Sequence, residues 1–106
     1  MNTSQNILQL LGIATRAGKI VTGEDLTVRE IQAGKAKLVI VSNDASANTM
    51  KKVTDKCNFF NVEKHVFGSR EELGHAMGKE SRVVLAVMDA GFAGKFSDYL
   101  NEYNRG

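Results

Sequence analysis

The segment Ala36-Lys37-Leu38-Val39-Ile40-Val41 is one of two short apolar runs that decide the fold. The second run is Arg82-Val83-Val84-Leu85-Ala86-Val87-Met88. Neither run shows the alternation of polar and apolar side chains that marks a strand with one face in water. Such runs are typical of strands that helices cover on both faces. We therefore expect both segments at the centre of a sheet with helices on each side.

Apolar residues at helical spacing surround these two runs. The spacing predicts helices over residues 7–16, 22–34, 47–60, 69–77 and 92–103, and further short strands over residues 19–21 and 65–67. Thr22 is expected to cap the second helix, with Asp25 as its capping-box acid. Ser69 and Glu72 have the spacing of a complete capping box. This alternation of elements predicts an α/β fold, a three-layer α/β/α sandwich with a four-stranded mixed sheet.

The composition describes one ordinary domain. The chain has 106 residues, of which 42% are hydrophobic and 25% charged, and both fractions are near globular averages. A chain of this size buries roughly two-thirds of the surface that its unfolded form exposes. Proline is absent, so the chain holds no proline-rich linker. We expect residues 1–106 to form a single domain.

The first residues of the chain and its single cysteine indicate the cellular compartment of the protein. Residues 1–4 lack a basic region followed by an apolar stretch, and no apolar run approaches the roughly 18 residues of a membrane span. Cys57 has no second cysteine with which to form a disulfide. We expect a cytoplasmic protein, a monomer, with no membrane contact.

Charge is distributed unevenly along the chain. The formal net charge is +2, and the whole excess lies in residues 1–40, which carry five basic and three acidic side chains. The remaining residues carry equal numbers of each sign. This balance permits a local nucleic-acid contact without indicating a general polycation.

The sequence offers little for catalysis, metal or cofactor binding. His65 and His75 have no partners at ligand spacing. Asp44 and Asp89 follow the two apolar runs, where turn or helix-capping roles are expected. Five residues separate Gly12 from Gly18-Lys19, whereas the nucleotide-binding motif needs four. We expect no enzyme activity, no metal and no cofactor.

Several segments, in order and at matching separations, carry a family resemblance. Arg16-Ala-Gly-Lys-Ile-Val-Thr-Gly23 and the run from Arg29 to Val41 resemble the kink-turn-binding large-subunit ribosomal protein family. Ser42-Asn-Asp-Ala-Ser46 and Leu73-Gly-His-Ala-Met-Gly-Lys79 continue the resemblance, and a short bacterial form of the family is the nearest likeness. The resemblance implies a three-layer α/β/α fold and RNA binding without catalysis.

Two elements grip a sharply bent RNA internal loop in that family. The resemblance places them at Gly23 to Arg29 and at Gly78 to Arg82. Free N–H groups at a helix N-terminus suit phosphate, and arginine can also pair with a guanine edge. The predicted RNA-binding residues are Arg16, Lys19, Gly23, Asp25, Arg29, Lys79, Ser81 and Arg82. The expected partner is structured RNA, with ribosomal RNA as a candidate.

Two positions depart from the family pattern. Strong kink-turn binders carry Asn-Glu where this chain has Asp25-Leu26, and the following basic position is Arg29. Glu24 and Asp25 also place two negative charges where a phosphate would sit. Their simpler interpretation is structural, because acids in a first turn stabilise a helix. An alternative function is therefore a protein-interaction module that docks on ribosomal or transcription proteins and has lost RNA specificity. A small-molecule enzyme is a weaker third hypothesis.

Other prominent side chains have structural interpretations. Cys57 and Phe60 fall on the apolar stripe of their helix, so we expect both in the core, with Phe59 packed at the helix end. Tyr99 and Tyr103 are expected in the core or at its edge. The helix that contains Cys57 also carries Lys51, Lys52 and Lys56, which are expected to form a solvated face. The alternative for these lysines is an extended RNA or ribosome contact.

Overall fold

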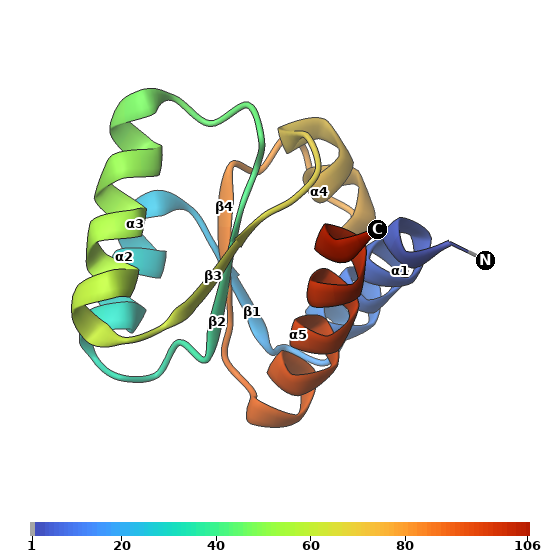
Figure 1. The fold of residues 1–106 in the computed structure, drawn as a ribbon, viewed down its shortest axis with the longest axis horizontal. Coiled ribbons are helices and arrows are strands. Elements are labelled where there is room, and N and C mark those ends of the chain that lie inside the picture. The colour runs from blue at the N-terminus through green and yellow to red at the C-terminus, as the bar shows by residue number, and fades with distance from the viewer. Residues whose placement is uncertain (1) are drawn as a thin grey trace.

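A computed structural model describes residues 2–106 of the chain. It contains helices and strands in regular alternation (Figure 1). The helices are α1 (Thr3–Arg16), α2 (Glu24–Gln32), α3 (Ala47–Phe60), α4 (Arg70–Ala76) and α5 (Ala90–Arg105). The strands are β1 (Ile20–Thr22), β2 (Leu38–Val41), β3 (Glu63–Val66) and β4 (Val84–Val87). Each predicted helix and strand is present, with bounds that differ by a few residues.

The sheet is four-stranded and mixed, with the order β1-β4-β2-β3. β4 runs antiparallel to both β1 and β2, whereas β2 and β3 are parallel. All residues of β2 and β4 are buried. The two apolar runs therefore occupy the centre of the sheet, as the sequence predicts.

Helices cover both faces of the sheet (Figure 1). α1, α4 and α5 pack on one face around a core that includes Leu11, Leu73 and Phe96. α2 and α3 pack on the other face, where Ile31 and Val53 meet β-strand residues. The three-layer α/β/α sandwich is confirmed.

Most helices begin at a side chain that caps the first turn. The side chains of Asn2, Ser46, Ser69 and Asp89 each accept a hydrogen bond from a first-turn N–H. Ser69 and Glu72 form the predicted capping box. The prediction that Thr22 caps α2 is wrong, because Thr22 belongs to β1 and Gly23 precedes the helix without a side-chain cap.

The end of α3 differs from the sequence prediction. Phe60 was expected in the core, but its side chain is exposed, and Phe59 is 81% exposed. Phe60 is the last residue of α3, so its ring lies beyond the stripe through which Val53 and Cys57 reach the core. The two rings contact each other edge to face, with centroids 4.9 Å apart. Tyr103 is 44% exposed and packs edge to face on the buried Phe67, which places it at the edge of the core, as predicted.

Cys57 is buried, as predicted, and burial raises the pKa of its thiol to about 11. Since the thiolate is the reactive form, we expect no reaction of the native protein with a thiol reagent at pH 8. The unfolded chain, whose thiol regains an ordinary pKa, should react fully. Absorbance at 412 nm with Ellman's reagent, with and without guanidinium chloride, measures this. Rapid reaction of the native protein would contradict the buried position.

No helix in residues 2–106 combines the length and apolar character that crossing a membrane requires.

Candidate nucleic-acid interface

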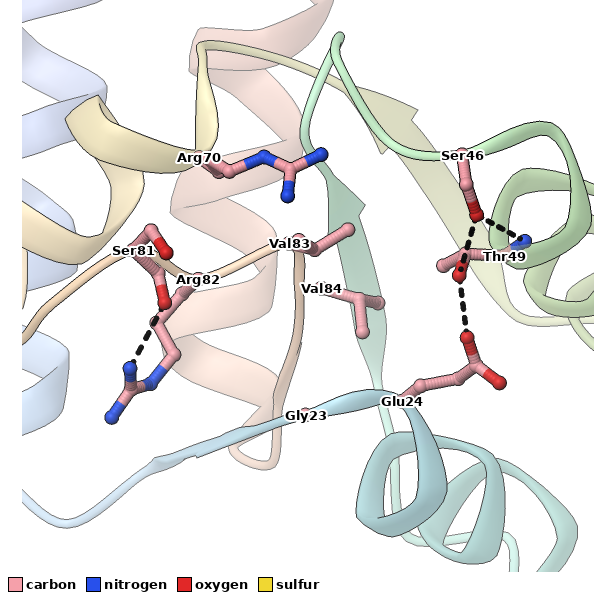
Figure 2. Close-up of a pocket in the computed structure, with 9 residues that line it drawn as sticks. All are labelled: Gly23, Glu24, Ser46, Thr49, Arg70, Ser81, Arg82, Val83 and Val84. Carbon is pink, nitrogen blue, oxygen red and sulfur yellow. Dashed lines mark hydrogen bonds between the residues drawn. The ribbon is translucent and has the colours of Figure 1, made fainter.

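A groove of about 370 Å³ lies at one end of the sheet (Figure 2). It forms where the end of β1, the first turns of α2, α3 and α4, and the segment before β4 meet. The residues that line it are Gly23, Glu24, Ser46, Thr49, Arg70, Ser81, Arg82, Val83 and Val84. The two segments that the family resemblance singles out, near Gly23 and near Arg82, therefore share one site.

Hydrogen bonds hold these two segments together. The N–H of Gly23 donates to the carbonyl oxygen of Val84 at 2.9 Å. The Nε of Arg82 donates to Oγ1 of Thr22 at 3.2 Å. Because β1 and β4 are antiparallel neighbours, the last residues of one strand necessarily lie beside the first residues of the other.

The first turn of α2 presents unpaired backbone donors to this end of the sheet. Gly23 has φ +100° and ψ 149°, a conformation that residues with a side chain rarely adopt. No side chain of residues 2–106 caps this turn. Its N–H groups, together with the positive end of the helix dipole, are available to an anionic ligand.

Gly74 of α4 sets the path of the segment before β4. A Cβ atom on Gly74 would lie 1.8 Å from the carbonyl oxygen of Glu80. The N–H of Lys79 donates to the carbonyl oxygen of Gly74, and the N–H of Arg82 donates to that of Arg70. This close approach of two backbones carries Ser81 and Arg82 to the groove.

Two arginines line the groove, and one of them is ion-paired, because Nε of Arg70 lies 3.4 Å from Oδ1 of Asp44. The guanidinium of Arg82 also donates from Nη1 to the carbonyl oxygen of Ser81 at 2.9 Å, so several bonds orient it. Arg70 was missed by the sequence analysis. Its Nη2 donates to the carbonyl oxygen of Asp44 at 2.7 Å. Asp44 follows a central strand and Arg70 follows a capping serine, so each position could be noticed in the sequence. Their contact could not be predicted, because only the fold brings the two residues together.

Glu24 is turned away from the arginines and toward α3 (Figure 2). Its carboxylate accepts a hydrogen bond from Oγ1 of Thr49 at 2.6 Å and lies 3.3 Å from Nζ of Lys52. The hydrogen bond from Thr49, and then that from Lys52, hold the pKa of Glu24 below its ordinary value. The carboxylate is therefore ionised at neutral pH, and its charge is balanced by Lys52 rather than directed at a ligand.

Asp89 and Asp44 occupy the structural positions expected of them. The side chain of Asp89 caps α5 by accepting from the N–H of Phe92. The side chain of Asp44 accepts from the N–H of Arg70 at the start of α4. Within residues 2–106, no cluster of histidine, cysteine and carboxylate side chains could hold a metal ion.

The other predicted RNA-binding residues lie outside the groove. Asp25 and Arg29 are exposed one turn apart on α2. Lys79 is exposed beside Ser81, in a hollow that borders the groove. Lys19 lies at the opposite end of β1, where its carbonyl oxygen accepts from Met88. Arg16 lies on the outer surface of α1 and α4. Arg16 and Lys19 are therefore not brought together with Gly23, Ser81 and Arg82.

The sheet order, the three layers and the groove at one sheet end define a small α/β/α sandwich of the ribosomal-protein type. The chain belongs to the Ribosomal protein L7Ae/L30e/S12e/Gadd45 family, whose model matches residues 5–97. This membership agrees with the expectation of a protein without enzyme activity.

Curated relatives and solved structures agree with this assignment. The chain is 54% identical to RNA-binding protein YlxQ of Bacillus subtilis over 87% of this chain and 92% of the relative. It is 35% identical to large ribosomal subunit protein eL30 of Tetrahymena thermophila, over 84% and 88%. A structure of a protein of unknown function from Bacillus halodurans superposes with a TM-score of 0.88 at 44% identity, covering 90% and 96%. The predicted likeness to a short bacterial family member is confirmed.

A solved structure of low sequence identity shares the fold with this chain. The 15.5 kD RNA-binding protein of Giardia lamblia has a TM-score of 0.82 at 20% identity, covering 97% of this chain and 88% of the other.

Proposed function

We propose that the protein binds a bent, kink-turn-like structured RNA in the groove and acts as a non-catalytic, ribosome-associated protein. The observation that carries the proposal is the meeting of two distant segments, at Gly23 and at Arg82, in one site. That site combines open backbone donors with guanidinium groups, both of which bind phosphate.

The shape of the groove favours a bent RNA over a regular duplex. Gly23, Ser81 and Val83 expose backbone and small or apolar surface between the charged groups at the rim. A-form duplexes hide their base edges in a deep major groove, whereas bulges and internal loops expose bases and bring phosphates close together. Phosphate contacts would position such an element, and contacts with the unstacked bases would select it.

The names of the relatives support both parts of the proposal. Two relatives are named RNA-binding protein, from Bacillus subtilis and from Enterococcus faecium, the latter 44% identical over 91% of this chain. Those named large ribosomal subunit protein are constituents of ribosomes, which supports ribosomal RNA as the target.

A salt titration tests the proposed function. A site with about four phosphate contacts should lose affinity for a kink-turn RNA with a log–log slope near −3 between about 50 and 300 mM KCl. A plain duplex of the same length and charge should bind more weakly at every salt concentration. Equal affinity for the two RNAs would contradict shape recognition. A lack of binding to both at low salt would favour the protein-interaction alternative.

Replacing Asp25 by asparagine should strengthen binding to a kink-turn RNA by roughly tenfold, or about 1.4 kcal/mol. The change removes a negative charge near the proposed phosphate sites and supplies an amide that can donate to a base edge. Filter binding of the kink-turn RNA at fixed salt measures the effect.

The matched control is Asp98→Asn, which makes the same charge change at an exposed position of α5. It should leave the affinity within about twofold. If both variants gained affinity equally, the effect would be one of net charge, and Asp25 would have no place in the site.

A further inference from the structure

The exposed aromatic pair at the end of α3 lies outside both core clusters and outside the groove. Phe59 is 81% exposed, although burying an aromatic side chain stabilises a folded protein. Phe60 contacts it only edge to face, with 73° between the ring planes. Together with Asp55 and Lys56 the two rings line a shallow hollow of about 320 Å³.

A continuous stripe of α3 connects this pair to the groove. Thr49 lines the groove, and Lys52, Lys56 and Phe59 follow at intervals of three, four and three residues. Residues at these intervals lie on one side of a helix. Ten residues of helix rise by about 15 Å. Figure 1 shows α3 running from the groove end of the sheet to the opposite end.

The charges along the stripe favour an anionic ligand. Lys52 balances Glu24, and the carboxylate of Asp55 accepts from Nζ of Lys51 at 2.8 Å. Within residues 2–106 Lys56 makes no ion pair, so its positive charge beside Phe59 is uncompensated. A flat apolar ring next to an ammonium group has the chemistry of a nucleotide site, in which a base stacks and its phosphate pairs with the cation.

We propose that a single-stranded segment flanking the RNA element in the groove extends along α3 and stacks a base on Phe59, with Lys56 at the adjoining phosphate. This inference rests on the proposed function of the groove. The segment must be single-stranded, because bases within a duplex are already stacked on one another and have no free face.

Two RNAs test the inference: a kink-turn element alone, and the same element with a short unstructured uridine flank on either end. The wild-type protein should bind the flanked RNA about tenfold more tightly. Phe59→Leu, which keeps an apolar side chain but removes the ring, should abolish this gain and bind the unflanked RNA like wild type. Because Phe59 is exposed, its replacement should leave the melting temperature within about 2 °C.

A fluorescence measurement gives a readout that does not depend on the groove. The chain contains no tryptophan, so Phe59→Trp introduces a single indole that retains the stacking surface. Single-stranded oligouridylate should quench its fluorescence, and Phe59→Trp should keep the affinity gain. The control is Ile13→Trp, an exposed position on the opposite helical layer, where no quenching is expected.

Equal wild-type affinity for the two RNAs, or a full gain in Phe59→Leu, would overturn the inference. The second result would show that the flank gains its affinity without stacking on the Phe59 ring. If the unflanked element binds with specificity but no quenching occurs, the α3 inference fails and the groove assignment stands. If oligouridylate quenches the indole while neither folded RNA binds specifically, the proposed function fails and stacking on Phe59 stands.

Discussion

Replacing Gly74 by alanine should lower the free energy of unfolding by about 3 kcal/mol. The added Cβ atom would meet the backbone carbonyl of Glu80 at 1.8 Å and its carbonyl carbon at 2.6 Å. Both are main-chain atoms of the segment that leads into β4, so no side-chain rotation can relieve the clash. Alanine favours a helix over glycine by about 1 kcal/mol, and the steric cost must exceed that gain.

Urea denaturation followed by circular dichroism measures the change. For a domain of this size, a loss of 3 kcal/mol corresponds to a decrease in melting temperature of at least about 10 °C. The same variant should bind a kink-turn RNA more weakly, because moving residues 78–82 displaces Ser81 and Arg82 from the groove.

The control for this variant is Gly94→Ala. Gly94 lies within α5, and nothing approaches its added Cβ within 4 Å. Alanine there should stabilise the protein by about 0.5–1 kcal/mol through helix propensity alone. If Gly74→Ala were as stable as Gly94→Ala, the segment before β4 would have room to move, and its fixed path could not define the groove.

The sequence predicts the fold well where local pattern and tertiary environment agree. Residues 38–41 and 84–87 contain no polar side chain, and only a position covered on both faces accommodates such strands. Ser69 and Glu72 form their capping box from residues three apart, so no distant contact is needed to predict it.

The predictions from sequence fail where contacts with distant residues decide which of two local conformations or environments a residue adopts. Thr22 has the residue type of a helix cap, but pairing with Leu85 of β4 keeps it in a strand and gives its hydroxyl to Arg82. Phe60 has the period of the core stripe, but the helix ends there and the ring stays partly exposed. Periodicity describes the face of a helix without describing what packs at its end.

The candidate site shows the same division. The resemblance pointed to the two segments that line the groove, whereas sequence proximity also suggested Arg16 and Lys19. The fold places Arg16 at the end of α1 and Lys19 before the start of β1, whereas Gly23 follows the end of that strand. Glu24 raised a further concern, since a carboxylate at the start of α2 would repel phosphate. The hydrogen bond from Thr49 turns the carboxylate toward α3, and the nearby Lys52 balances its charge. Both residues lie 25 or more positions later in the sequence, so the arrangement depends on the fold.

Reversing the charge of Arg82 should produce the largest loss of RNA affinity of any exposed or half-buried position. Arg82→Glu should weaken binding to a kink-turn RNA by roughly thirtyfold or more at 100 mM KCl, since a hydrogen bond to a charged group is worth about 1.5–3 kcal/mol. Repulsion between the new carboxylate and phosphate adds to this loss. The log–log salt slope should become less negative by about one, because one phosphate contact disappears.

Arg82 also bonds to Thr22 and Ser81, so a structural effect must be separated from an electrostatic one. Arg82→Gln removes the charge while retaining donors, and Arg82→Lys keeps the charge without the planar fork. If phosphate binding explains the loss, the lysine variant should retain more affinity than the glutamine variant, and both should melt near the wild-type temperature.

Lys35→Glu makes the same charge change at an exposed position beyond the C-terminal end of α2, away from the groove. It should reduce affinity by no more than about threefold. If Arg82→Glu and Lys35→Glu were equally impaired, the protein would bind RNA through its overall charge. The meeting of the β1–α2 segment with the segment before β4 would then have no part in recognition, because only one of the two positions lies where those segments meet.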